Sequence, residues 1–306
     1  MKLSLGAVLV FAAFAAGCAA PAAEEIEEEA TAGEDALIGG KPATVADFPA
    51  TLYLKDGCTA AKVAPKRVLT AAHCVVDPAT VSIVYPAGAK LALARDGKSF
   101  VEHEVAAVHV HPSWMRACEE TYCASSSATA LMDAADVAVI ELTRDLDGVP
   151  EAAIDPAPLA PGDAVVVLGF GCTEGVLAPD AHGRSSVPRS LAYADTRVVD
   201  ARRAIHEGSP VGADALPRVT GSYAMTPGPA FGKGGSAGLC PGDSGGPLYR
   251  RAGGELLVAG INANYTLRPE AEDTVGLPVT NWHTRLDAKS RHGIASWLAS
   301  VGVGRD

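Results

Sequence analysis

Short apolar runs separated by turn residues dominate the chain from residue 37 onward. Each run has the length of a β-strand and is bounded by Gly, Pro or Asp, which are typical of turns. The runs are Arg67–Ala72, Val81–Tyr85, Val105–Val110, Val137–Leu142, Ala164–Phe170, Leu191–Val199, Leu256–Asn262 and Val279–Leu286. Because no helical pattern separates these runs, the sequence predicts an all-β fold, either a sandwich or a barrel.

The C-terminal segment has a different period. In residues 288–301 the apolar side chains recur at the spacing of one helix face, namely at Ile294, Trp297, Leu298 and Val301. This segment predicts one amphipathic helix that packs its apolar face against the body of the protein.

The first 18 residues have the features of an export signal. Lys2 precedes an apolar stretch from Leu3 to Ala16, which is too short to serve as a stable membrane anchor. The residues Ala15-Ala16-Gly17-Cys18 resemble the lipobox of bacterial lipoproteins, in which the Cys receives a lipid. We expect an exported protein of the bacterial cell envelope, anchored to the membrane through Cys18. An ordinary secretory signal cut near Cys18, with release of the protein, is the alternative.

An Ala- and Glu-rich stretch follows at residues 19–36. It has almost no large apolar side chains, so it predicts a disordered tether or pro-segment. Residues 1–36 contain seven acidic residues and one basic residue, Lys2, and so carry −6 of the formal net charge of −11. This acidic balance argues against nucleic acid as a partner. The remaining residues, 37–306, form the predicted folded domain.

Three short motifs in this domain carry chemistry. They are Leu69-Thr70-Ala71-Ala72-His73-Cys74, the apolar run opened by Asp136, and Gly242-Asp243-Ser244-Gly245-Gly246-Pro247. A lone His beside a strand is more often structural, and an Asp before a strand is usually a turn residue. A Ser held between an Asp and two glycines before a Pro is a far more specific arrangement.

All three motifs, in this order, resemble the chymotrypsin/trypsin family of serine peptidases. The resemblance extends from about Leu37 to the C-terminal helix. It implies two antiparallel six-stranded β-barrels, at about 37–150 and 151–287, followed by a helix at about 288–301. It also implies a catalytic triad of His73, Asp136 and Ser244 in the cleft between the barrels.

The chemistry of peptide-bond hydrolysis explains these residue types. The hydroxyl of Ser244 is a poor nucleophile until a neutral imidazole, here His73, takes its proton. The carboxylate of Asp136 holds the imidazole in one tautomer and stabilises its charged form. The N–H groups of Gly242 and Ser244 are expected to form the oxyanion hole.

The α/β-hydrolases are a second family whose motif fits part of this sequence. Gly242-Asp243-Ser244-Gly245-Gly246 also fits the nucleophile elbow of α/β-hydrolases, whose acid and His follow the Ser in sequence. Asp273 or Asp287 with His283 or His292 could supply them. No alternating strand and helix pattern precedes Ser244, which disfavours this family.

The start of the domain suggests activation by proteolysis. Leu37-Ile38-Gly39-Gly40 resembles the mature N-terminus of the family, whose free amine pairs with the Asp before the nucleophile, here Asp243. We therefore expect cleavage before Leu37 by an activating protease. Ala36 does not suggest a trypsin-like activator, and Gly39-Gly40 as a simple turn is the alternative.

Removing Cys18 leaves six cysteines, which an exported protein is expected to pair. By resemblance, Cys58 and Cys74 form the bond that braces the His loop. Cys118 and Cys123, close in sequence, are expected to pair locally. Cys172 and Cys240 remain, and a bond between them is plausible but is not standard in the family.

The specificity pocket departs from the family pattern. Gly238 stands where trypsin has the Asp that binds basic side chains, and Leu239 follows it. Ala263, Asn264 and Tyr265 replace the usual S-W-G wall, and Asn281 replaces a small residue. Tyr265 should narrow the pocket, and Ala263 lacks a hydroxyl that normally supports the triad Asp. We expect no preference for Arg or Lys before the scissile bond.

The sequence thus predicts an exported serine endopeptidase that acts on polypeptides through an acyl-enzyme. The family requires no metal or organic cofactor, and we expect none. Because of Ala263 and Tyr265, a catalytically silent member acting as a binding module is the alternative.

Overall fold

The computed structural model describes residues 37–121, 123, 133–172, 190–206, 216–267 and 277–304. The expected export signal and the tether, residues 1–36, lie outside these ranges. Among the described residues, no helix has the length and apolar composition that crossing a membrane would require.

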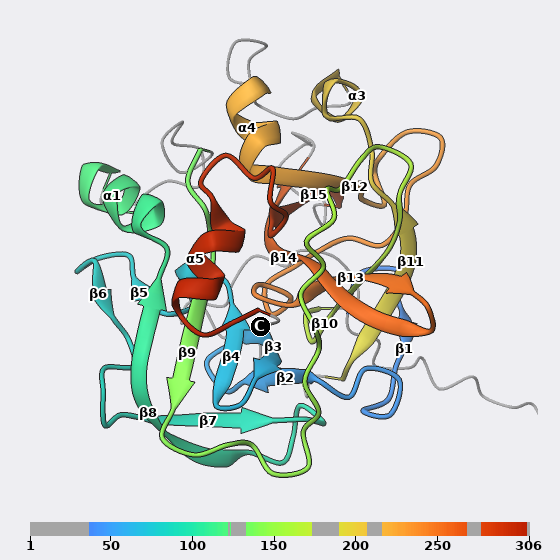
Figure 1. Cartoon of the computed structure of the whole chain (residues 1–306). Helices are drawn as coiled ribbons and strands as arrows, with labels where there is room; N and C mark the ends of the chain where they lie inside the picture. Colours follow the sequence, from blue (N-terminus) through green and yellow to red (C-terminus); the bar gives the residue numbers. More distant parts are fainter. Residues whose placement is uncertain are drawn as a thin grey trace, which may run out of the picture. The chain divides into compact units, whose positions relative to one another are not determined.

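The first half of the domain is a closed six-stranded antiparallel barrel, as predicted (Figure 1). Its strands run in the spatial order β2 (Thr51–Leu54), β3 (Cys58–Ala64), β4 (Arg67–Thr70), β9 (Ala138–Leu142), β8 (Val101–Val110) and β7 (Lys90–Ala94). Alternate side chains of these strands fill the interior, including Leu52, Leu54, Val68, Leu91, Val105 and Ile140. A small separate ladder joins β5 (Val76–Asp77) to β6 (Ser82–Ile83).

The second half is a seven-stranded antiparallel sheet. Its spatial order is β1 (Lys41–Pro42), β11 (Ala192–Arg197), β10 (Ala164–Gly169), β13 (Pro247–Ala252), β14 (Glu255–Leu267), β15 (Pro278–Arg285) and β12 (Tyr223–Pro227). The expected second six-stranded barrel is therefore not a closed ladder. The sheet nevertheless curls, since the N–H of Val199, just after β11, donates to the carbonyl of Met225 in β12 at 2.8 Å.

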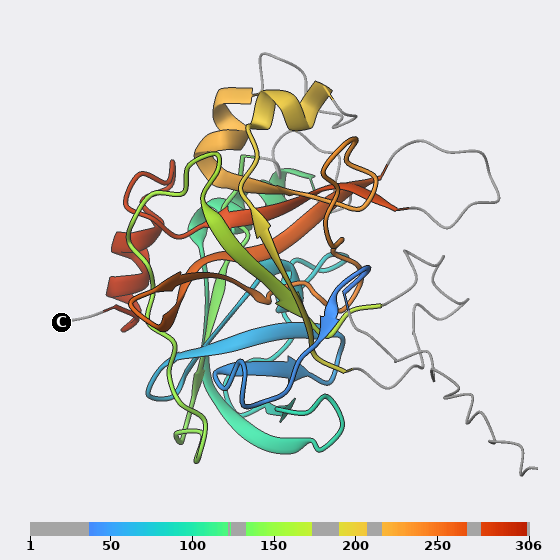
Figure 2. The same ribbon diagram turned by 90° about the vertical axis from the view of Figure 1, so that its right-hand side faces the viewer.

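The strand β1 belongs to this second sheet although it precedes the barrel in sequence. Figure 2 shows β1, in blue, beside β11, in yellow, and the ladder pairs Lys41 with Tyr193. The expected first segment, 37–150, thus contributes its first strand to the other half.

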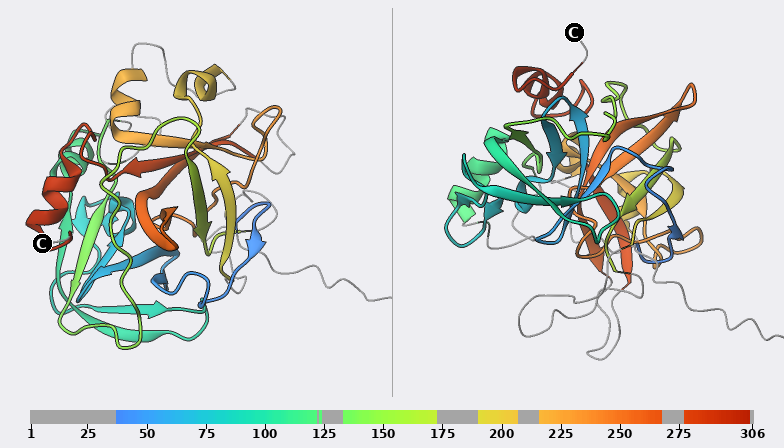
Figure 3. Two further views of the ribbon diagram at one scale, coloured as in Figure 1. Left: turned by 45° about the vertical axis from the view of Figure 1, so that its right-hand side comes forward. Right: turned by 90° about the horizontal axis from the view of Figure 1, so that it is seen from below.

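Four helices lie in the described residues: α1 (Pro112–Thr121), α3 (Ala201–His206), α4 (Leu216–Ser222) and α5 (Ile294–Ser300). Only α5 was predicted, and it is shorter than the expected 288–301. Figure 3 shows α5, in red, against the barrel strands, where Ile294 and Leu298 pack in one cluster with Leu69 and Val139. The sequence did not predict α1, α3 or α4.

A shared apolar cluster joins the two halves. It contains Ala61, Leu69 and Val139 from the barrel together with Leu168, Tyr249 and Ile261 from the second sheet. All ladders between the described strands are antiparallel. This arrangement excludes the α/β-hydrolase alternative, whose sheet is mostly parallel.

Candidate active site

His73 and Asp136 lie close together because two paired strands place them there. His73 is in a 3₁₀ turn, Ala72–Cys74, just after β4, and Asp136 lies just before β9. The register that pairs Thr70 with Ala138 brings these two strand ends together. The Nδ1 of His73 is 2.7 Å from Oδ2 of Asp136, and the backbone N–H of His73 donates to Oδ1 at 3.0 Å.

The electrostatics of this pair favour a basic imidazole. Burial by itself lowers the pKa of His73, but the negative charge and hydrogen bond of Asp136 outweigh burial and raise the pKa above 6.5. The Asp136 side chain is only 4% exposed, and its main-chain carbonyl accepts a hydrogen bond from the hydroxyl of Thr284 at 2.9 Å. The ring centroids of Trp114 and His73 lie 6.4 Å apart.

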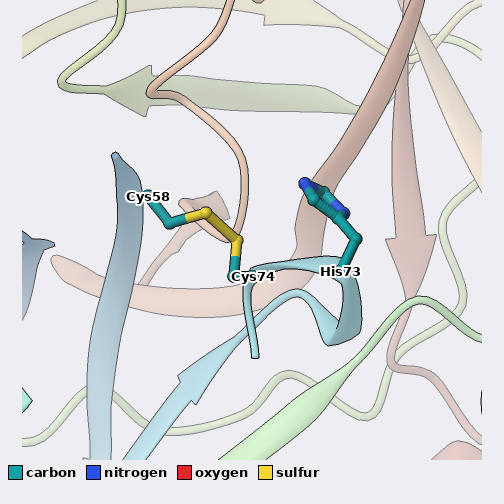
Figure 4. Close-up of side chains that lie close together, drawn as sticks. All are labelled: Cys58, His73 and Cys74. Carbon is teal, nitrogen blue, oxygen red and sulfur yellow. A yellow bond between two sulfur atoms is a disulfide. The ribbon is translucent and has the colours of Figure 1, made fainter. Parts of the chain in front are cut away.

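A disulfide between Cys58 and Cys74 braces the turn that carries His73. Figure 4 shows it joining the strand that begins at Cys58 to that turn. The donor atoms of Cys58, His73 and Cys74 lie within 4.8 Å of one another. Disulfide sulfurs are not thiolates, however, so this group does not have the chemistry of a metal site.

The loop that contains Ser244 is pressed against the His73 segment. Thr59 donates its backbone N–H to the carbonyl of Ser244 and its hydroxyl to the carbonyl of Gly242, both at 2.7 Å. Gly245 has φ +79°, and a Cβ there would lie 2.9 Å from the backbone N of Ala71. Only glycine permits this approach, which brings the loop next to the residues that lead to His73.

Two N–H groups of this loop are unpaired. Those of Asp243, Gly245 and Gly246 each donate to a backbone carbonyl. Those of Gly242 and Ser244 have no acceptor among the residues that the structure describes. N–H groups that have no acceptor among the described residues, in the same loop as the hydroxyl of Ser244, can bind a developing oxyanion.

Comparisons with known proteins identify the family of the chain. The family model described as Trypsin matches residues 37–282. The chain belongs to the trypsin family of serine peptidases. It is 32% identical over 162 residues to a trypsin of Saccharopolyspora erythraea, a match that covers 50% of this chain and 63% of the relative, less than two thirds of its length. It is also 25% identical over 241 residues to a cercarial protease of Schistosoma mansoni, covering 75% of this chain and 80% of that relative.

Family membership supports a serine endopeptidase that acts on polypeptides. Asp243 is the residue that the sequence predicts to pair with the amine of Leu37. The carboxylate of Asp243 is fully buried and accepts the N–H of Gly171 at 2.7 Å and the N–H of Cys240 at 2.9 Å. Leu37 is also fully buried, and Ile38 forms a two-hydrogen-bond bridge with Gly238.

The three expected disulfides are present: Cys58–Cys74, Cys118–Cys123 and Cys172–Cys240. The last one, which is not standard in the family, connects the segment after β10 to the loop before Ser244. It lies next to the Gly171–Asp243 hydrogen bond and so restrains the same segment. The three bonds fit an extracellular or otherwise oxidising location.

The expected pocket residues are largely occupied in bonding to one another. A Cβ at Gly238 would lie 2.8 Å from the Pro229 ring and 2.9 Å from the Pro278 ring, so this position has no room for a side chain. Asn281 is fully buried and hydrogen-bonds to the backbone of Ala237 and Leu239. The Asn281 side chain therefore links segments of the wall by hydrogen bonds and does not face an open pocket.

The remaining wall residues, Ala263, Asn264 and Tyr265, are partly exposed. Asn264 accepts the N–H of Tyr265 at 2.8 Å. Burial, followed by the charge of Asp243, raises the pKa of Tyr265, so its hydroxyl stays protonated at neutral pH.

Sequence reasoning missed several residues that hold the site. Thr59 clips the barrel to the Ser244 loop, and Thr284 supports the backbone of Asp136. Asn262 donates to the carbonyl of Asp243 at 3.0 Å. Each is a polar residue inside an otherwise ordinary strand, and only the position of a distant segment gives it a partner.

Proposed function

We propose that this protein is a serine endopeptidase in which Ser244 attacks the scissile carbonyl and forms an acyl-enzyme. His73 takes the hydroxyl proton and passes it to the leaving amine, while Asp136 holds the Nδ1–H tautomer. The N–H groups of Gly242 and Ser244 stabilise the oxyanion. The observation that carries this proposal is the 2.7 Å His73–Asp136 contact beside a serine loop with two unpaired N–H groups.

The second candidate, a silent binding module, has one observation in its favour. Ala263 provides no hydroxyl to support Asp136. The bond from Thr284 to the Asp136 carbonyl argues against the binding module, because it secures the backbone of the same residue by another route. We therefore favour the enzyme.

The proposal includes activation by cleavage before Leu37. Once freed, the amine of Leu37 would pair with the buried carboxylate of Asp243, and the pair would hold the oxyanion loop. The buried Leu37 and the Ile38–Gly238 bridge support this step, since both bring the segment to the pocket wall.

Specificity follows from the wall residues. Gly238 has no space for a carboxylate and Asn281 is committed to the wall, so small or medium uncharged side chains before the scissile bond are proposed. A peptide library cut mainly after Arg or Lys would contradict this preference.

Export is proposed from the N-terminal sequence, with the lipid on Cys18 as its more specific form. A fatty-acid analogue should label the wild type but not Cys18→Ala. An unlabelled, released precursor would support ordinary secretion instead.

An activity-based probe tests the central proposal. A fluorophosphonate should label the protein that begins at Leu37, and peptide mapping should find the label on Ser244. Ser244→Ala should abolish labelling, His73→Ala should reduce it sharply, and Ser300→Ala, which changes an exposed serine of α5, should leave it unchanged. Folded wild type that does not label would favour the binding module.

A further inference from the structure

Four buried polar side chains face one another across three neighbouring strands of the second sheet. They are Thr226 in β12, Asn281 and His283 in β15, and Asn262 in β14, and all four are 0% exposed. The registers place Thr226 opposite Asn281 and Asn262 opposite His283. Since alternate residues of a strand share a face, these four lie on one face of the sheet.

One end of this row is the wall of the substrate pocket. Asn281 Oδ1 accepts the N–H of Leu239 at 2.8 Å, and Asn281 Nδ2 donates to the carbonyl of Ala237 at 2.9 Å. The same Nδ2 group donates to the hydroxyl oxygen of Thr226 at 3.1 Å. A shift of the wall would therefore move the Asn281 amide and change its hydrogen bond to Thr226.

His283 carries the row onward, and its partners determine its tautomer. Its Nδ1 lies 2.9 Å from Oδ1 of Asn262, which can only accept, so Nδ1 bears the hydrogen. Its Nε2 must then accept from the Thr226 hydroxyl, 2.9 Å away. Burial lowers the pKa of His283 to about 3, so the imidazole stays neutral, and this pattern holds, at any pH where a serine peptidase works.

The other end of the row is the loop that carries Ser244. Asn262 Nδ2 donates to the carbonyl of Asp243 at 3.0 Å and to the carbonyl of Leu168 at 2.9 Å. The backbone of Asn262 accepts from Gly245 and donates to Gly246, both at 2.8 Å. Asn262 therefore hydrogen-bonds to the loop on both sides of Ser244.

We propose that His283 is a positioning residue that couples the wall of the substrate pocket to the Ser244 loop through the chain Asn281–Thr226–His283–Asn262. The hydrogen bonds from Asn281 to Thr226, from Thr226 to His283, from His283 to Asn262 and from Asn262 to the Asp243 carbonyl all donate in the same direction, away from the wall. A buried polar group that loses its partner costs free energy, so each member keeps its place only while its neighbours keep theirs. A substrate that seats correctly against the wall thereby stabilises the reactive position of Ser244. This inference rests on the proposed peptidase function.

The first test breaks the middle of the chain. In protein that begins at Leu37, His283→Phe keeps a ring of similar size but removes the acceptor of the Thr226 hydroxyl hydrogen and the donor to Oδ1 of Asn262. We expect kcat for a preferred peptide to fall about tenfold to hundredfold with little change in KM, from the typical cost of one buried unpaired group. Thr51→Val is the matched control. It also removes a buried hydroxyl, one that contacts Tyr249 in a different part of the core, and should lower stability while leaving kcat unchanged.

The second test measures coupling between the two ends. Asn281→Ala and Asn262→Ala are made singly and together, first in the wild type and then in the His283→Phe background. If the chain acts as a unit, the double variant in the wild-type background should be about as slow as the slower single variant. In the His283→Phe background, the two effects on kcat should multiply as independent changes.

The outcomes separate this inference from the function itself. Multiplying effects in the wild-type background, or a wild-type kcat for folded His283→Phe, would overturn the coupling. Absence of fluorophosphonate labelling in the wild type would instead overturn the peptidase proposal. If His283→Phe does not fold, Thr226→Val breaks the chain at another link with a side chain of the same shape, and the same loss of coupling is required of it.

Discussion

Gly169, Gly171 and Gly245 occupy positions where the backbone is packed too closely for a methyl group. A Cβ at Gly169 would lie 2.9 Å from Cα of Asp243, and one at Gly171 would lie 2.6 Å from Oδ1 of Asp243. Gly169 and Gly171 let the backbone pass close to Asp243, and Gly245 lets the Ser244 loop approach Ala71. At this scale the proposed site depends on residues without a side chain as much as on the proposed catalytic residues.

The ionisation of His73 gives the first prediction at the residue scale. Catalysis needs the neutral imidazole, and Asp136 raises the pKa of His73 above 6.5. We therefore expect kcat/KM to be lost as the pH falls, with the midpoint of the acid limb above pH 6.5. A pH profile of peptide hydrolysis by protein that begins at Leu37 measures this midpoint.

Asp136→Asn gives the matching variant. It removes the charge that raises the pKa of His73 and leaves the burial that lowers it, so the midpoint should move to lower pH. The rate should fall about ten-thousandfold, as it does for this substitution in a trypsin triad. Asp147→Asn, at an exposed position, should change neither the midpoint of the pH profile nor the rate. An unchanged midpoint in Asp136→Asn would contradict the role given to this pair.

At the scale of elements, the turns between strands carry the chemistry while the strands set its geometry. The β4–β9 register brings His73 to Asp136, and β14 presents Asn262 to the Ser244 loop. The Cys172–Cys240 disulfide adds a covalent link between the segment after β10 and the segment before β13. This link should matter for both stability and activity, because it restrains the surroundings of Asp243.

Replacing Cys172 and Cys240 together by Ser should lower the free energy of unfolding by about 4 kcal/mol, given the length of the loop they close. It should also lower kcat, because Gly171 and Asp243 lose a neighbouring restraint. Urea unfolding and peptide hydrolysis measure the two effects.

The Cys118 and Cys123 pair provides the control for this change. Its sequence separation is 5, against 68 for Cys172 and Cys240. Loop-closure entropy then predicts a loss of only about 2 kcal/mol on its replacement, without an effect on kcat. Equal effects on kcat from the two pairs would contradict the specific role of Cys172–Cys240.

At the scale of the whole molecule, the two halves share one apolar cluster, and the site draws on both. The barrel contributes His73 and Asp136, and the second sheet contributes Ser244 and the pocket wall. The start of the domain crosses from one to the other, because β1 pairs with β11 before the chain enters the barrel. Cleavage before Leu37 should therefore change the structure of the pocket.

Protein that begins at Leu37 should cut peptides more than about a hundredfold faster than protein that retains residues 19–36. A buried charge needs its partner, and breaking such a pair costs about 3–5 kcal/mol. Asp243→Asn should abolish the advantage. Initial rates of cleavage of one peptide compare the form that begins at Leu37, the form that retains residues 19–36, and the Asp243→Asn variant.

Protein that begins at Ala36 is the sharpest control for the amine. It differs by one small residue, yet it moves the amine away from Asp243, and it should resemble the longer form. Equal rates for the Ala36 and Leu37 forms would refute the activation proposal.

The sequence by itself determined the class of fold and the family, and the resemblance to that family implied the cysteine pairing. Each rests on local information: strand-length runs, short motifs around His73, Asp136 and Ser244, and a few spaced cysteines. Strand period and turn residues act over a few positions, so a single sequence can carry them. The helices α1, α3 and α4 were not predicted from the sequence.

The tertiary structure alone decided which polar residues serve the site. Nothing local distinguishes Thr59, Thr226 or Asn262 from other polar residues in strands, since their partners are up to 183 positions away, as for Thr59 and Gly242. Cross-strand register sets those partnerships, and register depends on the packing of whole sheets. For the same reason Asn281, expected to line the pocket, is bonded into its wall. The second barrel, expected to close, instead remains a curled sheet whose edge accepts β1.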